Sequence, residues 1–523
     1  MRESLREPRP GTIPFRVGCM ALMVGVLMFT TSLRAEVRPP AVAGQFYPDD
    51  VKELKSNLAT FLRGAAPGGA TPVALIAPHA GYVFSGPTAG KAFAPLAGSH
   101  VTRVILLGPS HHAAFRGGAL PAPRITAFAT PLGDMPVDTV TVAKLAEFPE
   151  FKGPSSAHDP EHCLEVELPF LQSTVGAVPI VPILVGSGTD RELARAIARR
   201  LADLLAPGTL VVVSSDFTHH GAPYGYNPFA GDRDLGGRLI ALGRSTAGRA
   251  AAIDPRGFWQ QIEVSDDTVC GARPISVLLE LLAHAFHGAG TIADVTTSGD
   301  VSRNWYQVVA YAGVDFVGAW GPWHEDAADP QLGVLSADEQ KAALALARAT
   351  LTTHLTHEGQ LADWFASHQV TGNLAAKAGV FVTINNRGAK ARKEGKLRGC
   401  IGVMEAHEPL VDAIVHAAVS AAHDPRFLDL DRAELAEVGV EVSVLSPMRP
   451  APGPEAIEVG KHGVVLTKGG RRAVFLPQVA TEQGWDVATM LSQLSLKAGL
   501  PPDAWRHDAS FEIFTAQVFG EQE

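Results

Sequence analysis

Short apolar runs alternate with helix-like stretches in the N-terminal part of the chain, and this alternation constrains the fold most. The apolar runs are rich in Val, Ile and Leu and lie at 73–77, 103–108, 179–186, 209–215 and 307–314. Continuous runs of this kind are typical of strands that are covered on both faces. Periodic stretches at 191–205 and 274–286 favour helices between them. We therefore predict an α/β domain with a largely parallel central sheet.

The pattern changes after residues 318–333, which are rich in Gly, Pro and Asp and which we interpret as a linker. Ser336 and Glu339 form a capping-box signature that predicts the start of a helix. Beyond it we expect a helix over 409–423, strands over 440–446 and 462–467, and a last helix that ends at Gly499. This mixture predicts an α+β second domain.

The first 35 residues have the composition of a secretory signal peptide. Arginines at positions 2, 6, 9 and 16 precede an apolar run at 18–29. That run is short for a membrane helix, which needs ~20 residues, so no stable membrane span is expected. We expect export to the periplasm or the cell exterior; the alternatives are an uncleaved signal that anchors the chain, and a wrongly chosen start codon. The predicted organisation is signal peptide 1–35, first domain 36–317, linker 318–333 and second domain 334–523.

Charge and cysteine content exclude several classes of protein. The net charge is 44 − 54 = −10, so we expect no general binding of nucleic acid. Behind the signal stand Cys163, Cys270 and Cys400, widely spaced and without a CxxC pair. This excludes zinc-ribbon and thioredoxin-like sites. One disulfide is possible in an oxidising compartment, and the sequence does not choose its partners.

Several predicted strands end in residues that bind metals. His79, the pair His111-His112 and Asp216 with His219 each follow an apolar run, and Cys270 enters a predicted helix. Ligands of open α/β sheets bind beyond the carboxyl ends of the strands. Imidazole and thiolate together suit iron, zinc or copper, whereas magnesium and calcium prefer oxygen. Adjacent residues of an extended segment point to opposite sides, so His112 is expected to support the loop or face a substrate.

The segment 158–170 carries further polar residues whose role the sequence leaves open. His162 and Glu165 lie one turn apart if the segment is helical. They would either support the ligands and bind substrate, or belong to a solvated helix N-terminus whose acids favour the helix dipole. For Glu167 we favour the solvated helix terminus.

Six collinear motifs resemble the Memo family. They are PPAVAGQFYP (39–48), APHAGYVFSG (77–86), LGPSHH (107–112), EHCLEVELPFL (161–171), VVVSSDFTHHG (212–221) and TVCGARPI (268–275). The family is similar in fold to LigB-like extradiol dioxygenases, which hold non-heme iron with two histidines and a carboxylate. The resemblance implies that His79, His111 and Cys270 are metal ligands, with Cys270 in place of the glutamate. It also implies that Asp216 and His219 are the remaining polar site residues, with His219 as the proton-transfer group.

The C-terminal part resembles the AMMECR family through LRGCIG, HDPRF (423–427), EVSVLSP (441–447), HGVVL (462–466) and FLPQVATEQGWD (475–486). Arg398, Gly399 and Cys400 form the centre of its first motif. This resemblance establishes no biochemical function. Memo-like and AMMECR-like proteins are associated with a radical SAM protein in the AmmeMemoRadiSam set, which implies a functional link to such a partner.

Together these features predict a metal-binding redox protein of the AmmeMemoRadiSam set, similar to non-heme-iron dioxygenases. The expected cofactor is a transition metal, Fe(II) or copper, and the substrate is an unknown small molecule or peptide. The alternative is a non-catalytic protein that binds peptide or metal through a vestigial site, with an AMMECR-like interaction module. A hydrolytic or zinc-based enzyme is a third hypothesis.

Overall fold

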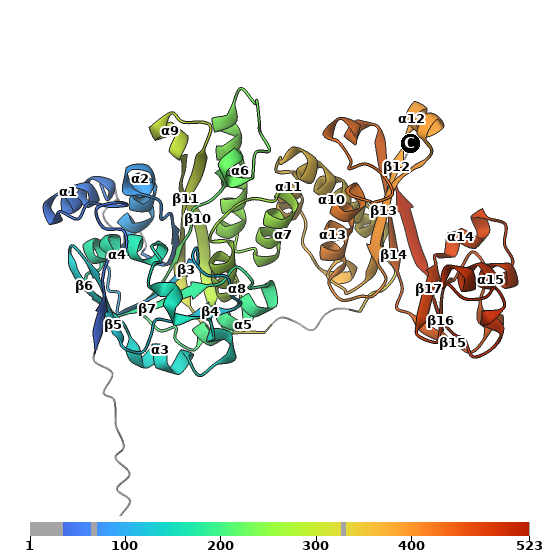
Figure 1. Ribbon diagram of the computed structural model, residues 1–523, viewed down its shortest axis with the longest axis horizontal. Helices are drawn as coiled ribbons and strands as arrows, with labels where there is room; N and C mark the ends of the chain where they lie inside the picture. Colours follow the sequence, from blue (N-terminus) through green and yellow to red (C-terminus); the bar gives the residue numbers. More distant parts are fainter. Residues whose placement is uncertain (1–34, 64–70, 326–330, 522–523) are drawn as a thin grey trace, which may run out of the picture.

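A mixed sheet with a parallel centre organises the first domain (Figure 1). The structure is a computed structural model that describes residues 35–63, 71–325 and 331–521, so the predicted signal peptide up to residue 34 lies outside the described part. Within the described residues the sheet has eight strands, in the order β10–β11–β2–β8–β3–β7–β4 with β9 paired to β11. Their bounds are β2 (Pro72–Ala77), β3 (Arg103–Pro109), β4 (Gly118–Ala119), β7 (Ile180–Val185), β8 (Thr209–Ser214), β9 (His219–His220), β10 (Phe286–Thr297) and β11 (Val308–Trp320).

The four central strands run parallel, which confirms the predicted sheet type. β2 pairs with β8, β8 with β3 and β3 with β7, all in parallel register. Every residue of β7 and β8 is buried, as expected for strands covered on both faces. The run expected at 307–314 is the start of β11, which instead runs antiparallel to β2 and continues to Trp320, three residues into the predicted linker.

Helices cover this sheet, and α4 and α8 both pack against β3 and β8. A small three-stranded sheet lies beside them and joins β1 (Glu36–Arg38) to β5 (Ile125–Thr130) and β6 (Gly133–Pro136). The helices of the domain are α1 (Val51–Phe61), α2 (Tyr82–Phe93), α3 (Thr139–Leu145), α4 (Cys163–Thr174), α5 (Arg191–Ala202), α6 (Leu235–Ala251), α7 (Pro255–Ser265), α8 (Ala272–Ala285) and α9 (Ser298–Ser302). The predicted helices over 191–205 and 274–286 are therefore present as α5 and α8.

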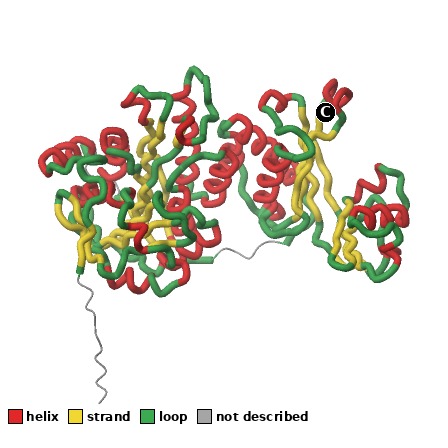
Figure 2. The backbone as a smooth tube through the Cα atoms, viewed as in Figure 1, coloured by secondary structure: helices red, strands yellow, loops and turns green. Residues whose placement is uncertain are grey.

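The second domain is α+β, as predicted, and contains two antiparallel four-stranded sheets within the described residues (Figure 2). The first sheet is β13 (Leu397–Val403), β12 (Gly379–Asn386), β14 (Val438–Leu445) and β19 (Ala516–Gly520). The second is β15 (Arg449–Ala451), β18 (Ser510–Phe514), β16 (Gly463–Lys468) and β17 (Arg471–Phe475). The helices are α10 (Ala337–Thr356), α11 (Gln360–Ser367), α12 (Gly388–Glu394), α13 (Leu410–Ala422), α14 (Pro477–Glu482) and α15 (Val487–Lys497). The capping box of Ser336 and Glu339 opens α10 as expected.

Helix α7 of the first domain contacts α10, α11 and α13 of the second. Val264, near the end of α7, is buried in the hydrophobic core of the second domain. On the other side, the buried Asp412 of α13 lies 3.3 Å from Arg256 Nε and accepts a hydrogen bond from Gln260, both in α7. The domains therefore share an interface with a buried polar centre. In the described part of the chain, no helix has both the length and the hydropathy of a membrane span.

Candidate metal centre

The carboxyl ends of three central strands bring the predicted polar residues together. His79 follows β2, His111 follows β3 and Asp216 follows β8, and the parallel pairing of these strands places all three at one edge of the sheet. Gly108, in β3, permits the close approach of α4, because a Cβ there would lie 2.6 Å from Cys163 Sγ. A residue with a side chain would force β3 and α4 apart at the point where His111 is positioned.

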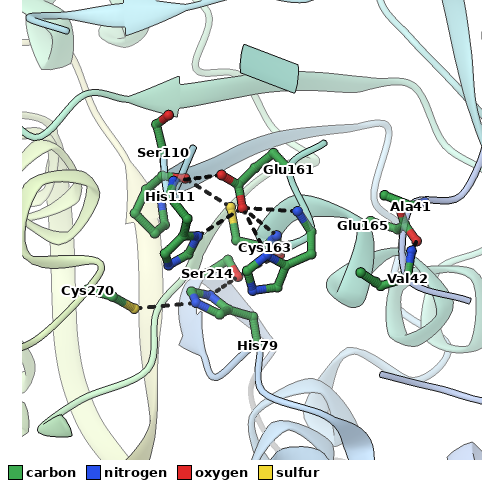
Figure 3. A network of polar contacts seen from close by, with 12 residues as sticks. Ala41, Val42, His79, Ser110, His111, Glu161, Cys163, Glu165, Ser214 and Cys270 are labelled. Carbon is green, nitrogen blue, oxygen red and sulfur yellow. Dashed lines mark hydrogen bonds and ion pairs between the residues drawn. The ribbon is translucent and has the colours of Figure 1, made fainter. Parts of the chain in front are cut away.

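Cys270 approaches the two histidines from the segment between α7 and α8 (Figure 3). Its Sγ lies 3.3 Å from His79 Nε2. The possible ligand atoms of His79, His111 and Cys270 all lie within 4.8 Å of one another. Gly271 makes this approach possible, because a Cβ at that position would lie 2.3 Å from the Ser215 side chain. The structure thus brings together the three predicted ligands.

His111 is oriented by Glu161, a buried residue at the entry to α4. Glu161 Oε1 lies 2.9 Å from His111 Nδ1, and Oε2 accepts a hydrogen bond of 2.7 Å from the His111 backbone N–H. His162 and Cys163 donate their backbone N–H groups to the same carboxylate. Burial alone would raise the pKa of Glu161, but the hydrogen bonds from His111 and His162 hold it well below its usual range. An ionised Glu161 accepts from His111 Nδ1 and leaves Nε2 for a metal.

His79 is held by two polar contacts and is neutral. Its Nδ1 lies 2.8 Å from Ser214 Oγ, and its backbone N–H donates to Asp216 Oδ1 over 2.9 Å. Burial, and then the neighbouring His111 and His162, hold the pKa of His79 well below its usual range. A neutral imidazole is the form that binds transition metals.

A cavity of about 460 Å³ opens beside these residues. Predicted site residues that line it are His79, His111, His162, Asp216 and His219, and the other walls include Phe46, Phe84, Tyr224, Asn304, Gln307 and Tyr311. His219 Nδ1 lies 3.0 Å from the Thr268 carbonyl and therefore carries a proton, because a carbonyl only accepts. Nε2 of His219 is then a proton acceptor next to the cavity.

The other candidates of the first domain have different positions. His162 lies beside the predicted ligands, with its ring centroid 4.8 Å from that of His111 and 5.4 Å from that of His79. His112 is exposed and lies outside the lining of the cavity. Glu165 forms a buried ion pair of 2.7 Å with Arg38 and accepts hydrogen bonds from Ala41, Val42 and Tyr47. Glu165 therefore anchors the N-terminal segment, and its carboxylate oxygens are fully engaged there.

The three residues of the AMMECR-like motif, Arg398, Gly399 and Cys400, contact neighbouring parts of the second domain. Arg398 forms a two-pronged ion pair with Glu434 over 3.0 and 2.9 Å. A Cβ at Gly399 would lie 2.2 Å from the Ala421 carbonyl oxygen, so this position requires glycine. Cys400 is half-buried and accepts a hydrogen bond of 3.2 Å from Thr383 Oγ1. Cys163, Cys270 and Cys400 are all free thiols.

Comparison with known proteins places both halves of the chain. Residues 38–315 match the model of the Memo-like protein family, and residues 344–519 match the AMMECR1 model. The chain belongs to the Memo family. It is 34% identical over 294 residues to a MEMO1 family protein of Methanopyrus kandleri, across 53% of this chain and 98% of that protein. The two matches in one chain confirm the predicted fusion.

Two further proteins are similar to parts of this Memo-family chain. A protein memo-1 homolog of Caenorhabditis elegans is 32% identical over 257 residues, across 47% of this chain and 71% of that protein. Among solved structures, an uncharacterised protein of Pyrococcus horikoshii is 34% identical and covers 36% of this chain and 94% of its own, with a TM-score of 0.32.

The donor atoms of the Memo domain suit a transition metal. Bonds of about 2.0–2.3 Å to nitrogen and sulfur in a tetrahedral site separate neighbouring ligand atoms by roughly 3.5 Å. The 3.3 Å between His79 Nε2 and Cys270 Sγ is close to this value. Burial, and then the neighbouring Asp216, raise the pKa of the Cys270 thiol, so metal binding must displace its proton.

Three residues of the Memo domain that surround the ligands were not recognised from the sequence. They are Glu161, Ser214 and Glu167. The interpretation of Glu167 as a solvated residue of a helix N-terminus is wrong, because its side chain is fully buried and lies 2.8 Å from Ser214 Oγ. The sequence LEVELPF (164–170) places two glutamates within an otherwise apolar stretch. Because acids in such surroundings are buried only when they are paired, this pattern could have predicted buried, hydrogen-bonded glutamates.

Proposed function

We propose that this Memo–AMMECR fusion is a metal-dependent redox protein whose first domain holds iron(II) or copper at His79, His111 and Cys270. The observation that carries the proposal is the meeting of two imidazoles and one sulfur within 4.8 Å of one another, with both imidazoles in the lining of an open cavity. Two nitrogen ligands and a thiolate select a transition metal over magnesium or calcium. When bound there, such an ion supplies open coordination positions and one-electron chemistry.

The protein's own residues have separate tasks in this proposal. Glu161 orients His111, and Asp216 fixes the backbone of His79 through its hydrogen bonds to His79 and Ala80. Nε2 of His219 accepts a proton from the substrate, since Nδ1 is engaged by Thr268. Phe46, Phe84 and Tyr224 give the cavity aromatic walls against which a substrate can pack.

A non-catalytic binding protein is the second candidate, and one observation favours it. Phe84, an aromatic residue in the cavity lining, is 37% exposed. Large apolar side chains next to an open cavity favour a bulky ligand such as a peptide. In this reading the metal holds the ligand and no turnover occurs.

Metal analysis and oxygen uptake distinguish the two functions. Protein purified without oxygen is expected to contain iron or copper in equimolar amount, and the metal-loaded protein is expected to consume oxygen in the presence of a reductant. His111→Ala should abolish both, whereas His112→Ala should leave both intact. Stoichiometric metal without oxygen uptake would favour the binding protein, and the absence of any metal in the wild-type protein would contradict the proposed metal site.

The proposals for the location and the partner of the protein come from its sequence. We propose export by the N-terminal segment and a functional link to a radical SAM protein, the latter supported by the pairing of Memo and AMMECR1 domains in one chain. Mass spectrometry of the protein from intact cells should find an N-terminus near Glu36. An intact Met1 on protein from the cytoplasm would contradict export.

Loss of the radical SAM protein should change the metal content of this protein, and an unchanged content would contradict the link.

A further inference from the structure

Ser214 Oγ is the meeting point of three polar groups behind the candidate metal centre. It lies 2.8 Å from His79 Nδ1, 2.8 Å from the Cys163 carbonyl oxygen and 2.8 Å from Glu167 Oε1. His79, Ser214 and Glu167 are each buried, so water does not compete for these contacts. The groups come from the end of β2, the end of β8 and the first turns of α4.

Counting protons decides how these groups can pair. A serine hydroxyl donates one hydrogen and accepts through two lone pairs. The Cys163 carbonyl only accepts, so all three contacts are hydrogen bonds only if this carbonyl receives the Ser214 proton. The two lone pairs of Ser214 Oγ then remain, and His79 Nδ1 and Glu167 Oε1 must each donate to one of them. Glu167 donates only as a neutral carboxylic acid.

We propose that Glu167 is a positioning residue for His79. As a carboxylic acid it donates to Ser214 Oγ, directs the serine proton to the Cys163 carbonyl, and thereby keeps the His79 proton on Nδ1. Nε2 of His79 then carries the lone pair that faces Cys270 and binds the metal. This inference rests on the proposed metal site and identifies the residue that prepares one of its ligands.

The surroundings of Glu167 agree with a neutral acid. Its side chain is fully buried, and its second oxygen, Oε2, has no hydrogen-bond partner in the described part of the chain. A charged carboxylate with one bare oxygen in the interior is costly, whereas a neutral acid is tolerated. Burial also raises the pKa of Glu167 well above its usual range.

Two variants separate the role of the donated proton from that of mere packing. Glu167→Gln keeps a donor, the amide N–H, in the same place, whereas Glu167→Leu removes it. In the metal-free protein, nitrogen-15 NMR should find the His79 proton on Nδ1 in the wild type and in Glu167→Gln, and a mixture of tautomers in Glu167→Leu. Titration with Co²⁺, followed by the sulfur-to-cobalt absorption of Cys270, should give an affinity within about threefold of the wild type for Gln and at least about tenfold weaker for Leu.

Glu165→Gln is the matched control, because Glu165 lies on the same helix and contacts Arg38 instead of Ser214. It should leave the His79 tautomer unchanged.

Infrared spectroscopy tests the neutral acid even if Glu167→Leu does not fold. A carboxylic-acid band that is present in the wild type and lost in Glu167→Gln would support the proposal, and absence of that band would overturn it. An unchanged tautomer in folded Glu167→Leu would also overturn it. If Co²⁺ does not bind the wild type, the proposed metal function fails, while the metal-free NMR measurement still decides the role of Glu167.

Discussion

Glu161 is the residue on which the geometry around His111 depends most. One buried carboxylate accepts from three backbone N–H groups and faces the Nδ1 atoms of His111 and His162. Glu161→Gln replaces one acceptor oxygen with an NH₂ group that opposes these donors. We expect it to weaken Co²⁺ binding by about ten- to hundredfold, the usual cost of losing the partner of a ligating histidine. The same titration on Glu147→Gln, an exposed position, should match the wild type, and equal affinities in both variants would contradict this role.

The three candidate ligands should be at least as sensitive to substitution as Glu161. His79→Ala, His111→Ala and Cys270→Ser are each expected to lower iron(II) or copper affinity at least about tenfold, because each removes one of three donors. His112→Ala should change it less, since His112 is exposed and outside the cavity lining. Thermal melts recorded beside the titrations should show that all four variants fold. Wild-type affinity in the His79 and His111 variants would disprove the site.

The sequence predicted which candidate ligands meet but not the residues that orient them, and the reason is physical. His79 and His111 each follow an apolar run, and parallel strands end at one edge, so their meeting could be predicted. Glu161 and Glu167 lie in or next to a helix whose position over the sheet depends on long-range packing. The local sequence pattern predicted a solvated environment for Glu167, whereas the packing of α4 on the sheet buries its side chain against Ser214 of β8.

At the scale of elements, the pair Arg38–Glu165 fastens β1 to α4. Both side chains are buried, and Arg38 also donates to the carbonyl of His158 over 2.7 Å. Arg38→Met should lower the free energy of unfolding by about 3–5 kcal/mol, because it leaves the Glu165 carboxylate buried without its cation. Arg124→Ala breaks the exposed pair with Glu36 and should cost less than about 1 kcal/mol. Urea unfolding of both variants checks this, and similar losses would contradict the special role of the buried pair.

The local sequence pattern predicted which segments are strands better than it predicted which strands pair with one another. The strands at 73–77, 103–108, 179–186 and 209–215 are present as β2, β3, β7 and β8. The run at 307–314 was also a strand, but its antiparallel direction and its extension to Trp320 depend on pairing with β10. The alternation of polar and apolar residues and the apolar content of a segment indicate which faces of a strand are buried. They do not indicate which neighbouring strand it pairs with or in which direction.

At the scale of the whole molecule, an ion-pair cluster at the domain interface predicts a dependence on pH. His416 of α13 lies 3.2 Å from Glu263 of α7 and 3.0 Å from Glu408. The hydrogen bonds to Glu263 and Glu408 raise the pKa of His416 to about 10. A folded pKa above the unfolded value of about 6.5 stabilises the protein fully below pH ~6.5, and this contribution is lost as the pH rises through about 10.

The variant His416→Gln isolates this contribution. The difference in melting temperature between wild type and His416→Gln should be largest near pH 6 and should shrink toward zero above pH 10. His407→Gln is the control, since His407 is exposed and contacts only Glu405 of its own domain among the described residues. A difference that stays constant from pH 6 to 10 would contradict a charged His416 at the interface.

Helix α7 connects the second domain to the candidate metal centre. Its face packs on the second domain, and only a short segment after Ser265 leads to Thr268, which holds His219, and to Cys270. The helix therefore lies between the AMMECR domain and the candidate ligand Cys270. A molecule that binds the second domain and tilts α7 would alter the distance between the Cys270 sulfur and the His79 imidazole, and by thermodynamic reciprocity a metal bound at this site would alter the affinity for that molecule.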